Sequence, residues 1–169
     1  ENPPHDVNVI IENSALGGQI KHELDKDAGI IIVDRFIGTP MHYPANYGMI
    51  PNTLGGDGDP IAGLVVSPEP LLPGTMIRSR PVGVLKMEDD GGMDEKLLLV
   101  PFSKVTPIYD DIETYEDLPK PLIDQIHHFF ERYKDLESGK WVKIDGWYGP
   151  EAAEKLIVEG IERLQSKAA

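Results

Sequence analysis

Short apolar runs separated by turn residues fill the first part of the chain, a pattern that predicts β-strands. We expect strands at residues 7–12, 19–24, 30–36, 61–66, 75–87 and 96–100, with a long structured loop at 37–52. The run IIIVDRF at 30–36 predicts a buried strand that carries Arg35 at its end. Pro81 and Gly83 predict a bend or bulge in the strand that contains them.

Helical periodicity begins only late in the chain. In residues 121–134 the apolar positions are Leu122, Ile126, Phe129, Phe130 and Tyr133, which share one helix face. A second helix is expected from Pro150, a residue suited to the first turn; its apolar stripe is Ala153, Ile157, Gly160, Ile161 and Leu164. Short strands followed by two helices indicate an α+β fold with a small closed or partly closed barrel.

The bulk composition narrows the classes of function. A length of 169 residues without a domain-sized linker predicts one domain over 1–169. The formal charge of −13 disfavours nucleic acid and anionic membranes as partners, so an anionic substrate would need local basic residues or metal ions. No apolar run long enough to span a membrane and no secretory leader is visible. The absence of cysteine excludes thiol chemistry and fits the cytosol.

The stretch DGDP at 57–60 is the first candidate for chemistry. Gly58 and Pro60 exclude a helix, so Asp57 and Asp59 lie in a turn before the strand at 61–66. Paired carboxylates at such a place suit Mg²⁺ or Ca²⁺, and the alternative is a solvated acidic turn. An EF-hand is excluded because the required Gly and Glu positions hold other residues.

A second acidic turn at residues 88–95 could converge with the first if both strands belong to one barrel. A cluster of carboxylates is costly at neutral pH unless cations hold it together. Basic and phenolic groups occupy comparable places, namely Lys21, Arg35, Lys96, Tyr133 and Lys134. Each alone would be a solvated or core residue, but together with hard-metal ligands they indicate phosphoryl transfer to water.

The chain resembles the family I soluble inorganic pyrophosphatases, in their bacterial form, over nearly its whole length. The matching segments are IKHE at 20–23, VDRF at 33–36, YPANYG at 43–48, DGDP at 57–60, RPVGVLKM at 80–87, DEK at 94–96, HFFERYKDLE at 128–137 and GKWVK at 139–143. The resemblance implies a small five-stranded OB-like β-barrel with additional strands and two flanking helices. It also implies a homohexamer and Mg²⁺-dependent hydrolysis of pyrophosphate, with several Mg²⁺ ions per subunit.

The same resemblance implies roles for particular residues. Asp57, Asp89 and Asp94 look like direct metal ligands, and Glu12 and Glu23 look like outer carboxylates that hold metals partly through water. Asp59 looks like the catalytic base. The residues that look like phosphate-binding groups are Lys21, Arg35, Tyr47, Lys96, Tyr133 and Lys134. Of these, Lys21, Arg35, Tyr47 and Lys134 also look catalytic. Tyr43 is expected to line the same cavity.

One position departs from the family pattern in its chemistry. The family signature Asp-x-Asp-Pro-x-Asp ends in a metal-binding Asp, and here that position is Ala62. A methyl group cannot bind Mg²⁺, so we expect slow hydrolysis. An engineered substitution, a natural pseudo-enzyme or rescue by a neighbour such as Asp59 would each give this sequence. His22 and Met49 also differ from the family and are expected to be packing changes.

Three hypotheses of function remain open at this point. The first is a cytoplasmic magnesium pyrophosphatase whose activity is reduced by Ala62. The second is a non-catalytic homologue that binds pyrophosphate or metal. The third is a phosphohydrolase that acts on nucleotides, although no glycine-rich phosphate loop is evident. Within the hexamer hypothesis, His128 falls where family subunits meet, which predicts a pH-sensitive assembly; the alternative is a simple surface histidine.

Overall fold

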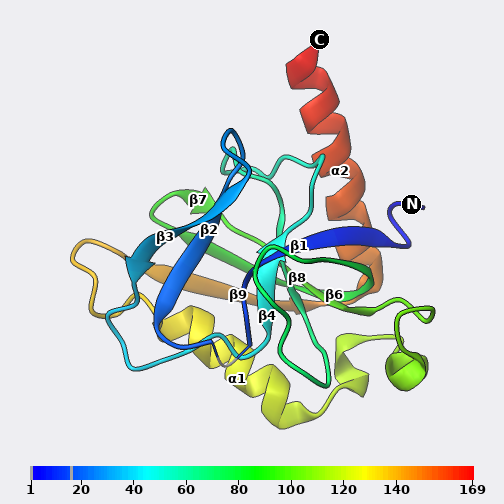
Figure 1. Ribbon diagram of the computed structural model, residues 1–169, viewed down its shortest axis with the longest axis horizontal. Helices are drawn as coiled ribbons and strands as arrows, with labels where there is room; N and C mark the ends of the chain where they lie inside the picture. Colours follow the sequence, from blue (N-terminus) through cyan, green and yellow to red (C-terminus); the bar gives the residue numbers. More distant parts are fainter. Residues whose placement is uncertain (1, 16) are drawn as a thin grey trace.

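Figure 1 shows the computed structural model of the chain, which describes residues 2–15 and 17–169. Glu1 and Leu16, which the expected domain 1–169 includes, lie outside the described residues. The strands are β1 (Val7–Asn13), β2 (Ile20–Asp25), β3 (Ile30–Phe36), β4 (Asn46–Met49), β5 (Ala62–Val65), β6 (Met76–Asp89), β7 (Gly92–Met93), β8 (Lys96–Pro101) and β9 (Val142–Tyr148). The helices are η1 (Pro107–Tyr109), η2 (Tyr115–Asp117), α1 (Lys120–Arg132) and α2 (Pro150–Ala168). Every strand and helix expected from the sequence is therefore present.

The strands β1, β4, β5, β8 and β6 pair in a closed ring. β1 pairs with β4, β4 with β5, and β8 with β6 in antiparallel register, whereas β5 and β8 are parallel. The ring closes because β6 also pairs with β1, with Val9 opposite Ile77. β7 and β9 extend the sheet from β6. This arrangement confirms the expected barrel with additional strands and two flanking helices.

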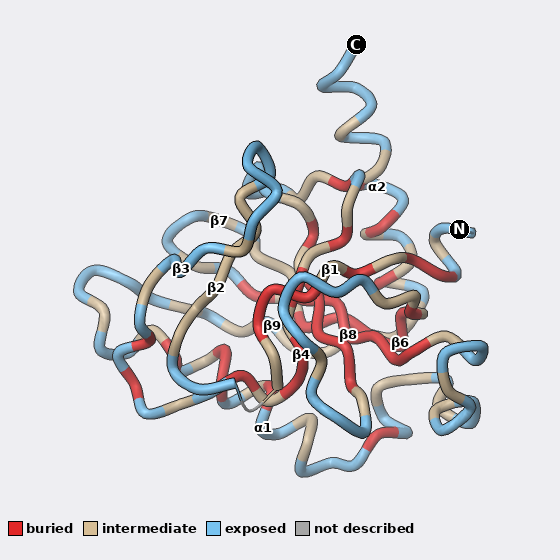
Figure 2. Tube along the Cα trace, viewed as in Figure 1, coloured by how far each residue is buried: buried red, intermediate tan, exposed pale blue. Residues whose placement is uncertain are grey.

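The hydrophobic core has two parts that share the barrel strands. On β8, Leu98 and Val100 belong to the cluster that contacts α1, whereas Leu97 and Leu99 belong to the cluster that contacts α2. A strand buried on both faces explains the unbroken apolar run that the sequence shows there. Figure 2 shows this burial concentrated along β6, β8 and their neighbours. Burial of each large side chain contributes roughly 1.5–3 kcal/mol, so packing along the barrel strands stabilises the fold.

The prediction that residues 30–36 form a buried strand is wrong in its burial. β3 pairs only with β2 among the described strands, and these two form a separate hairpin beside the barrel (Figure 1). Ile30, Val33 and Phe36 are exposed, the last by 72%. An apolar run indicates that a strand favours burial. It does not show whether the strand lies in the core of its own chain or stays exposed in the single chain.

Three strands were not predicted from the sequence: β4, β9 and the two-residue β7, which lies inside the expected acidic turn at 88–95. β4 lies inside the expected loop at 37–52, and its Gly48 is needed because a Cβ there would stand 2.0 Å from the backbone oxygen of Ile10 on β1. The glycine that permits this close approach also removes the usual strand signal. β9 alternates polar and apolar residues from Val142 to Asp145, a signal that the sequence did offer.

The expected bend in β6 is confirmed. Its register with β8 shifts between Pro81 and Gly83, where a Cβ on the glycine would lie 2.9 Å from the Tyr115 ring. α2 begins as expected, with Pro150 in its first turn, whereas α1, expected at 121–134, spans Lys120–Arg132. None of the helices in the described part of the chain combines the length and the apolar content that a bilayer span requires.

Candidate functional site

A cavity of about 350 Å³ lies where the β2–β3 hairpin faces the barrel. It is lined by side chains from most of the strands, from both acidic turns and from the segment that follows α1. Its lining includes the carboxylates Glu12, Glu23, Asp57, Asp59, Asp89 and Asp94 and the other predicted residues Lys21, Arg35, Tyr47, Lys96, Tyr133 and Lys134. Residues far apart in the sequence therefore meet in one polar cavity, as the resemblance implied.

Tyr43 is the exception among the predicted lining residues. Its side chain is buried behind the cavity, where its ring stacks on that of Tyr47 with 5.0 Å between centroids. Burial raises the pKa of Tyr43 well above its ordinary value, so it is a neutral packing residue. His22 and Met49, which are expected to be packing changes, also line the cavity.

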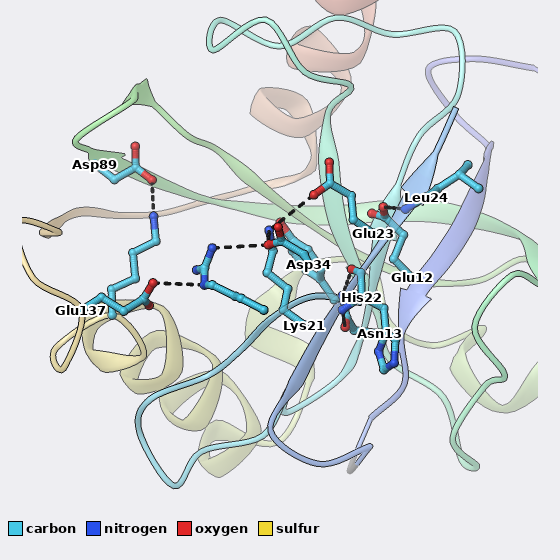
Figure 3. A network of polar contacts seen from close by, with 12 residues as sticks. Glu12, Asn13, Lys21, His22, Glu23, Leu24, Asp34, Asp89 and Glu137 are labelled. Carbon is cyan, nitrogen blue, oxygen red and sulfur yellow. Dashed lines mark hydrogen bonds and ion pairs between the residues drawn. The ribbon is translucent and has the colours of Figure 1, made fainter. Parts of the chain in front are cut away.

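The end of β1 fixes the hairpin against the barrel (Figure 3). The Asn13 side chain donates to the carbonyl of His22 at 2.9 Å and accepts from its backbone N–H at 2.7 Å. The Glu12 carboxylate accepts from the backbone N–H of Leu24 at 2.7 Å. Burial, together with the charge of Glu23, raises the pKa of Glu12. Glu12 is thus a buried carboxylate at the edge of the cavity with one fixed hydrogen bond.

The first acidic turn places its two carboxylates in different environments. Asp57 Oδ1 accepts from the backbone N–H of Asp59 at 3.0 Å, and Gly58 supplies the left-handed backbone (φ +92°) that this turn needs. Burial raises the pKa of Asp57, and the charges of Asp94 and Asp59 add to this effect. The Asp59 side chain is 73% exposed and lies 3.8 Å from Lys26 Nζ at the tip of the hairpin. Asp57 is therefore the desolvated member of the pair and Asp59 the hydrated one.

Lys96 forms the most buried charged contact of the cavity. Its Nζ lies 2.7 Å from Asp94 Oδ1 and donates to the Tyr47 hydroxyl at 2.8 Å. Burial alone would lower the pKa of Lys96, but Tyr47 and Asp94 raise it well above its ordinary value. Burial raises the pKa of Tyr47, so its hydroxyl stays protonated. The result is a fixed ammonium beside a phenol on the floor of the cavity.

The second acidic turn carries two more lysine–carboxylate pairs. Asp89 Oδ2 lies 2.7 Å from Lys134 Nζ, and Asp90 Oδ2 lies 2.7 Å from Lys140 Nζ. Burial alone would lower the pKa of Lys134, but its interactions with Tyr133 and Asp89 raise it overall. The segment after α1 is thereby tied to the turn between β6 and β7.

The hairpin contributes the remaining cations. Lys21 Nζ lies 2.9 Å from Asp34 Oδ2, and this hydrogen bond lowers the pKa of Asp34. Arg35 Nη1 lies 3.5 Å from the same carboxylate oxygen, and Arg35 Nε lies 3.0 Å from Glu137 Oε1 (Figure 3). The hairpin and the segment after α1 thus meet through Arg35.

Because of these contacts, the described carboxylates of the cavity do not form one close group. Asp89 and Asp94 are each paired with a lysine, and among the residues that the structure describes no three His, Asp or Glu side chains are grouped closely enough to hold a metal ion. The structure brings the predicted ligands to one cavity but not into one coordination sphere. Their chemistry nevertheless fits a hard divalent cation, because all the donors are carboxylate oxygens and the raised pKa of Asp57 reflects a charge that a cation would stabilise.

Ala62 lies at the first position of β5 and lines the cavity beside this acidic group. It is paired in register with Met49 on β4 and with Lys96 on β8. It also lines a second, smaller cavity that contains Glu95, Glu159 and Arg163. Asp57 and Asp94 line the same two cavities as Ala62.

Some residues in contact with the site were not assigned a role from the sequence. They are Lys26, Asp34, Asp90, Glu137 and Lys140, each of which is paired with a charged residue of the cavity or lines it. Three of the five, Asp34, Glu137 and Lys140, lie inside the matching segments, which was the signal that could have drawn attention to them. Their partners lie on other elements, so the sequence does not reveal the pairing.

Comparison with known proteins agrees with the sequence resemblance. Residues 9–165 match the family model described as inorganic pyrophosphatase. The inorganic pyrophosphatase of Agrobacterium fabrum is 57% identical over 167 residues, which cover 99% of this chain and 94% of that protein. The crystal structure of an inorganic phosphatase from Anaplasma phagocytophilum has a TM-score of 0.96 and 46% identity, covering 98% of this chain and 96% of the other. An inorganic pyrophosphatase from Coxiella burnetii has a TM-score of 0.94 and 48% identity, with 96% and 97% covered.

Proposed function

This chain belongs to the inorganic pyrophosphatase family, and from that membership we propose that it hydrolyses inorganic pyrophosphate to two phosphates in the presence of Mg²⁺. The observation that carries the proposal is the single cavity in which carboxylates alternate with lysine, arginine and tyrosine side chains. Such a cavity offers oxygen ligands to metal ions and hydrogen-bond donors to a polyanion at the same time. Both are needed because the protein carries a formal charge of −13.

In this proposal Asp57, Asp89 and Asp94 bind the metal ions directly. Glu12 and Glu23 support the ions from the edge, partly through water. Mg²⁺ held there would lower the pKa of water and polarise the phosphoryl oxygens. The remaining roles in the mechanism belong to side chains of the protein.

In two of the lysine–carboxylate pairs, the lysine can exchange its carboxylate partner for a phosphate oxygen. Lys96 and Lys134 now contact Asp94 and Asp89, which are proposed metal ligands. When those carboxylates bind metal, the ammonium groups become available to the phosphate oxygens. Metal binding and pyrophosphate binding should therefore favour each other.

Asp59 is the proposed base. Its carboxylate is the hydrated member of the acidic turn and lies 3.8 Å from Lys26 Nζ. It accepts the proton of the attacking water, whose oxygen bonds to one phosphorus while the bond from that phosphorus to the bridging oxygen breaks. The bridging oxygen leaves with the second phosphate. Lys21, Arg35, Tyr47, Lys96, Tyr133 and Lys134 would bind the phosphate oxygens and stabilise the developing charge.

Ala62 should make this chain a slow enzyme, and the substitution Ala62→Asp tests both the function and this claim. We expect phosphate release from pyrophosphate in Mg²⁺ to rise tenfold or more, which corresponds to about 1.4 kcal/mol of barrier. Ala62→Asn is the matched control, because it adds nearly the same volume without a charged ligand and should recover little of that gain.

The other outcomes of the same assay are equally informative. Full activity in the parent chain would mean that another group supplies the missing ligand and that our interpretation of Ala62 is wrong. Pyrophosphate binding without release from either form would favour the alternative, a non-catalytic homologue that binds pyrophosphate or metal. A panel of nucleotides assayed beside pyrophosphate separates both hypotheses from a nucleotide phosphohydrolase.

We further infer that residues 1–169 form one domain and assemble as a homohexamer in the cytoplasm. The exposed apolar residues of β3 and the exposed His128 on α1 support an assembly, since both would gain cover from neighbouring subunits. Sedimentation should give a hexamer at neutral pH that dissociates on acidification, and a monomer at neutral pH would contradict the inference. One cooperative unfolding transition is expected for the domain.

A further inference from the structure

Glu137, a residue without a role in the proposed mechanism, contacts Arg35 from outside the cavity. The Arg35 guanidinium lines the cavity, whereas Glu137 belongs to the segment after α1 and does not line it. Arg35 Nε and Glu137 Oε1 are 3.0 Å apart, and the two side chains are only 31% and 20% exposed. An ion pair this sheltered is screened less by water and salt than a surface pair.

The pair is unusual in its hydrogen bonding. Arg35 Nε and Glu137 Oε2 are both buried, and neither has a hydrogen-bond partner among the described residues. A buried donor and a buried acceptor left unused in one contact call for a functional explanation. The two side chains are therefore close enough for an ion pair although their hydrogen bond is not aligned.

A second carboxylate competes for the same guanidinium. Asp34 Oδ2 lies 3.5 Å from Arg35 Nη1 and also binds Lys21 Nζ at 2.9 Å. Asp34 therefore draws Arg35 along the hairpin toward Lys21, while Glu137 draws it toward the end of α1. Neither carboxylate is among the proposed metal ligands, so both contacts persist when metal ions occupy the others.

The Arg35–Glu137 contact also joins the hairpin to the segment after α1. The hairpin is fixed to the barrel through β1, by the contacts of Asn13 and Glu12 with β2. Arg35 lies on the other strand, β3, and its partner Glu137 lies three residues after Lys134. The ion pair therefore sets the distance between Arg35 and the cations at the end of α1.

We propose that Glu137 is a positioning residue for Arg35, which it holds by the Nε edge so that the Nη groups stay directed at the phosphate-binding part of the cavity. This inference rests on the proposed function, because Arg35 is taken there to bind a phosphate group. Without Glu137, Asp34 keeps the guanidinium, and the affinity for a diphosphate falls although no group that touches the ligand has been removed.

The test has two measurements. Calorimetry in Mg²⁺ measures the binding of methylenediphosphonate, a diphosphate analogue whose P–C–P bridge cannot be hydrolysed. Steady-state kinetics gives kcat and KM for pyrophosphate. Glu137→Gln should raise both the dissociation constant of the analogue and the KM about tenfold, a value within the coupling energies of contacting residues. Glu137→Asp keeps the charge and should recover part of the loss. Glu131→Gln on α1 is the matched control, since the Glu131–Arg132 contact is long, at 3.8 Å, and exposed.

A double-mutant cycle with Arg35→Gln separates positioning from general support of the fold. In that background Glu137→Gln should cause no further loss of binding. An equal loss with and without Arg35, or Glu137→Gln behaving like Glu131→Gln while the parent chain binds the analogue, would overturn the inference and leave the proposed function intact. If the parent chain neither binds the analogue nor releases phosphate, the proposed function fails, and the role of Glu137 fails with it. If Glu137→Gln does not fold, Glu137→Asp takes its place in the cycle. It should cause a smaller loss of affinity in the parent chain and no loss in the Arg35→Gln background.

Discussion

Lys96→Met tests how strongly the cavity depends on its own ion pairs. The substitution keeps an unbranched side chain of similar length but removes an ammonium that contacts Asp94 at 2.7 Å and Tyr47 at 2.8 Å. The Lys96 side chain is 5% exposed and that of Asp94 is 14% exposed. Asp94 would then keep its charge in a poorly hydrated place without the partner that stabilises it.

The expected cost follows from this burial. Removal of one partner of a buried ion pair costs about 3–5 kcal/mol. Because Asp94 lines the open cavity and is partly hydrated, the lower end, about 3 kcal/mol, applies to metal-free protein. At roughly 2–4 °C per kcal/mol for a chain of this size, the melting temperature should fall by about 6–12 °C.

The assay is thermal unfolding of parent and variant in a chelator and again in excess Mg²⁺. If Asp94 is a metal ligand, the cation takes the place of the ammonium, and the difference between the two proteins should shrink in Mg²⁺. Lys155→Met is the control, because Lys155 forms an exposed pair with Glu159 at 3.7 Å and should change stability by less than about 0.5 kcal/mol. A Lys96→Met variant that melts within about 2 °C of the parent without metal would refute the reasoning.

Further expected outcomes concern the barrel and the N-terminal segment. Gly48→Ala should abolish most of the folded yield, measured by circular dichroism, because its Cβ would overlap the backbone of Ile10, whereas Gly56→Ala meets nothing within 4 Å and should behave like the parent. Two hydrogen bonds from Arg78, of 2.7 and 3.0 Å, lower the pKa of Asp6 far below its ordinary value. A lowered pKa stabilises the fold above the ordinary pKa near 4 and ceases to do so as the pH falls, so Asp6→Asn should cost about 1–3 kcal/mol in urea unfolding at pH 7 and progressively less below pH 4. A difference that grew on acidification would contradict this account.

Much of the barrel could be predicted from the sequence because burial on one or both faces leaves a readable pattern. The apolar run of β8 and the periodic face of α1 are examples, and both are core. The same rule failed for β3, whose apolar residues face outward in the single chain. It also missed β4, where close contact between strands requires Gly48 in place of a strand-forming residue.

The site was predictable in its membership but not in its contacts. Asp57 and Asp59 stand out locally, because Gly58 and Pro60 force a turn before a buried strand. The assignment of Lys21 or Arg35 came from the resemblance to a family, since each alone is an ordinary charged residue. The ion pair between Arg35 and Glu137 joins residues that are distant in the chain, and no local pattern encodes it.

The unequal attachment of the hairpin and the barrel has a consequence for how activity is lost. β6 pairs with β1, β7, β8 and β9, and its residues contribute to both hydrophobic clusters, so its amide hydrogens should be among the slowest to exchange with solvent. The β2–β3 hairpin has few buried side chains and should open locally long before the barrel melts. Because Lys21, Glu23 and Arg35 travel with that hairpin, mild heat or low concentrations of urea should inactivate the protein while its spectroscopic signature remains that of a folded chain.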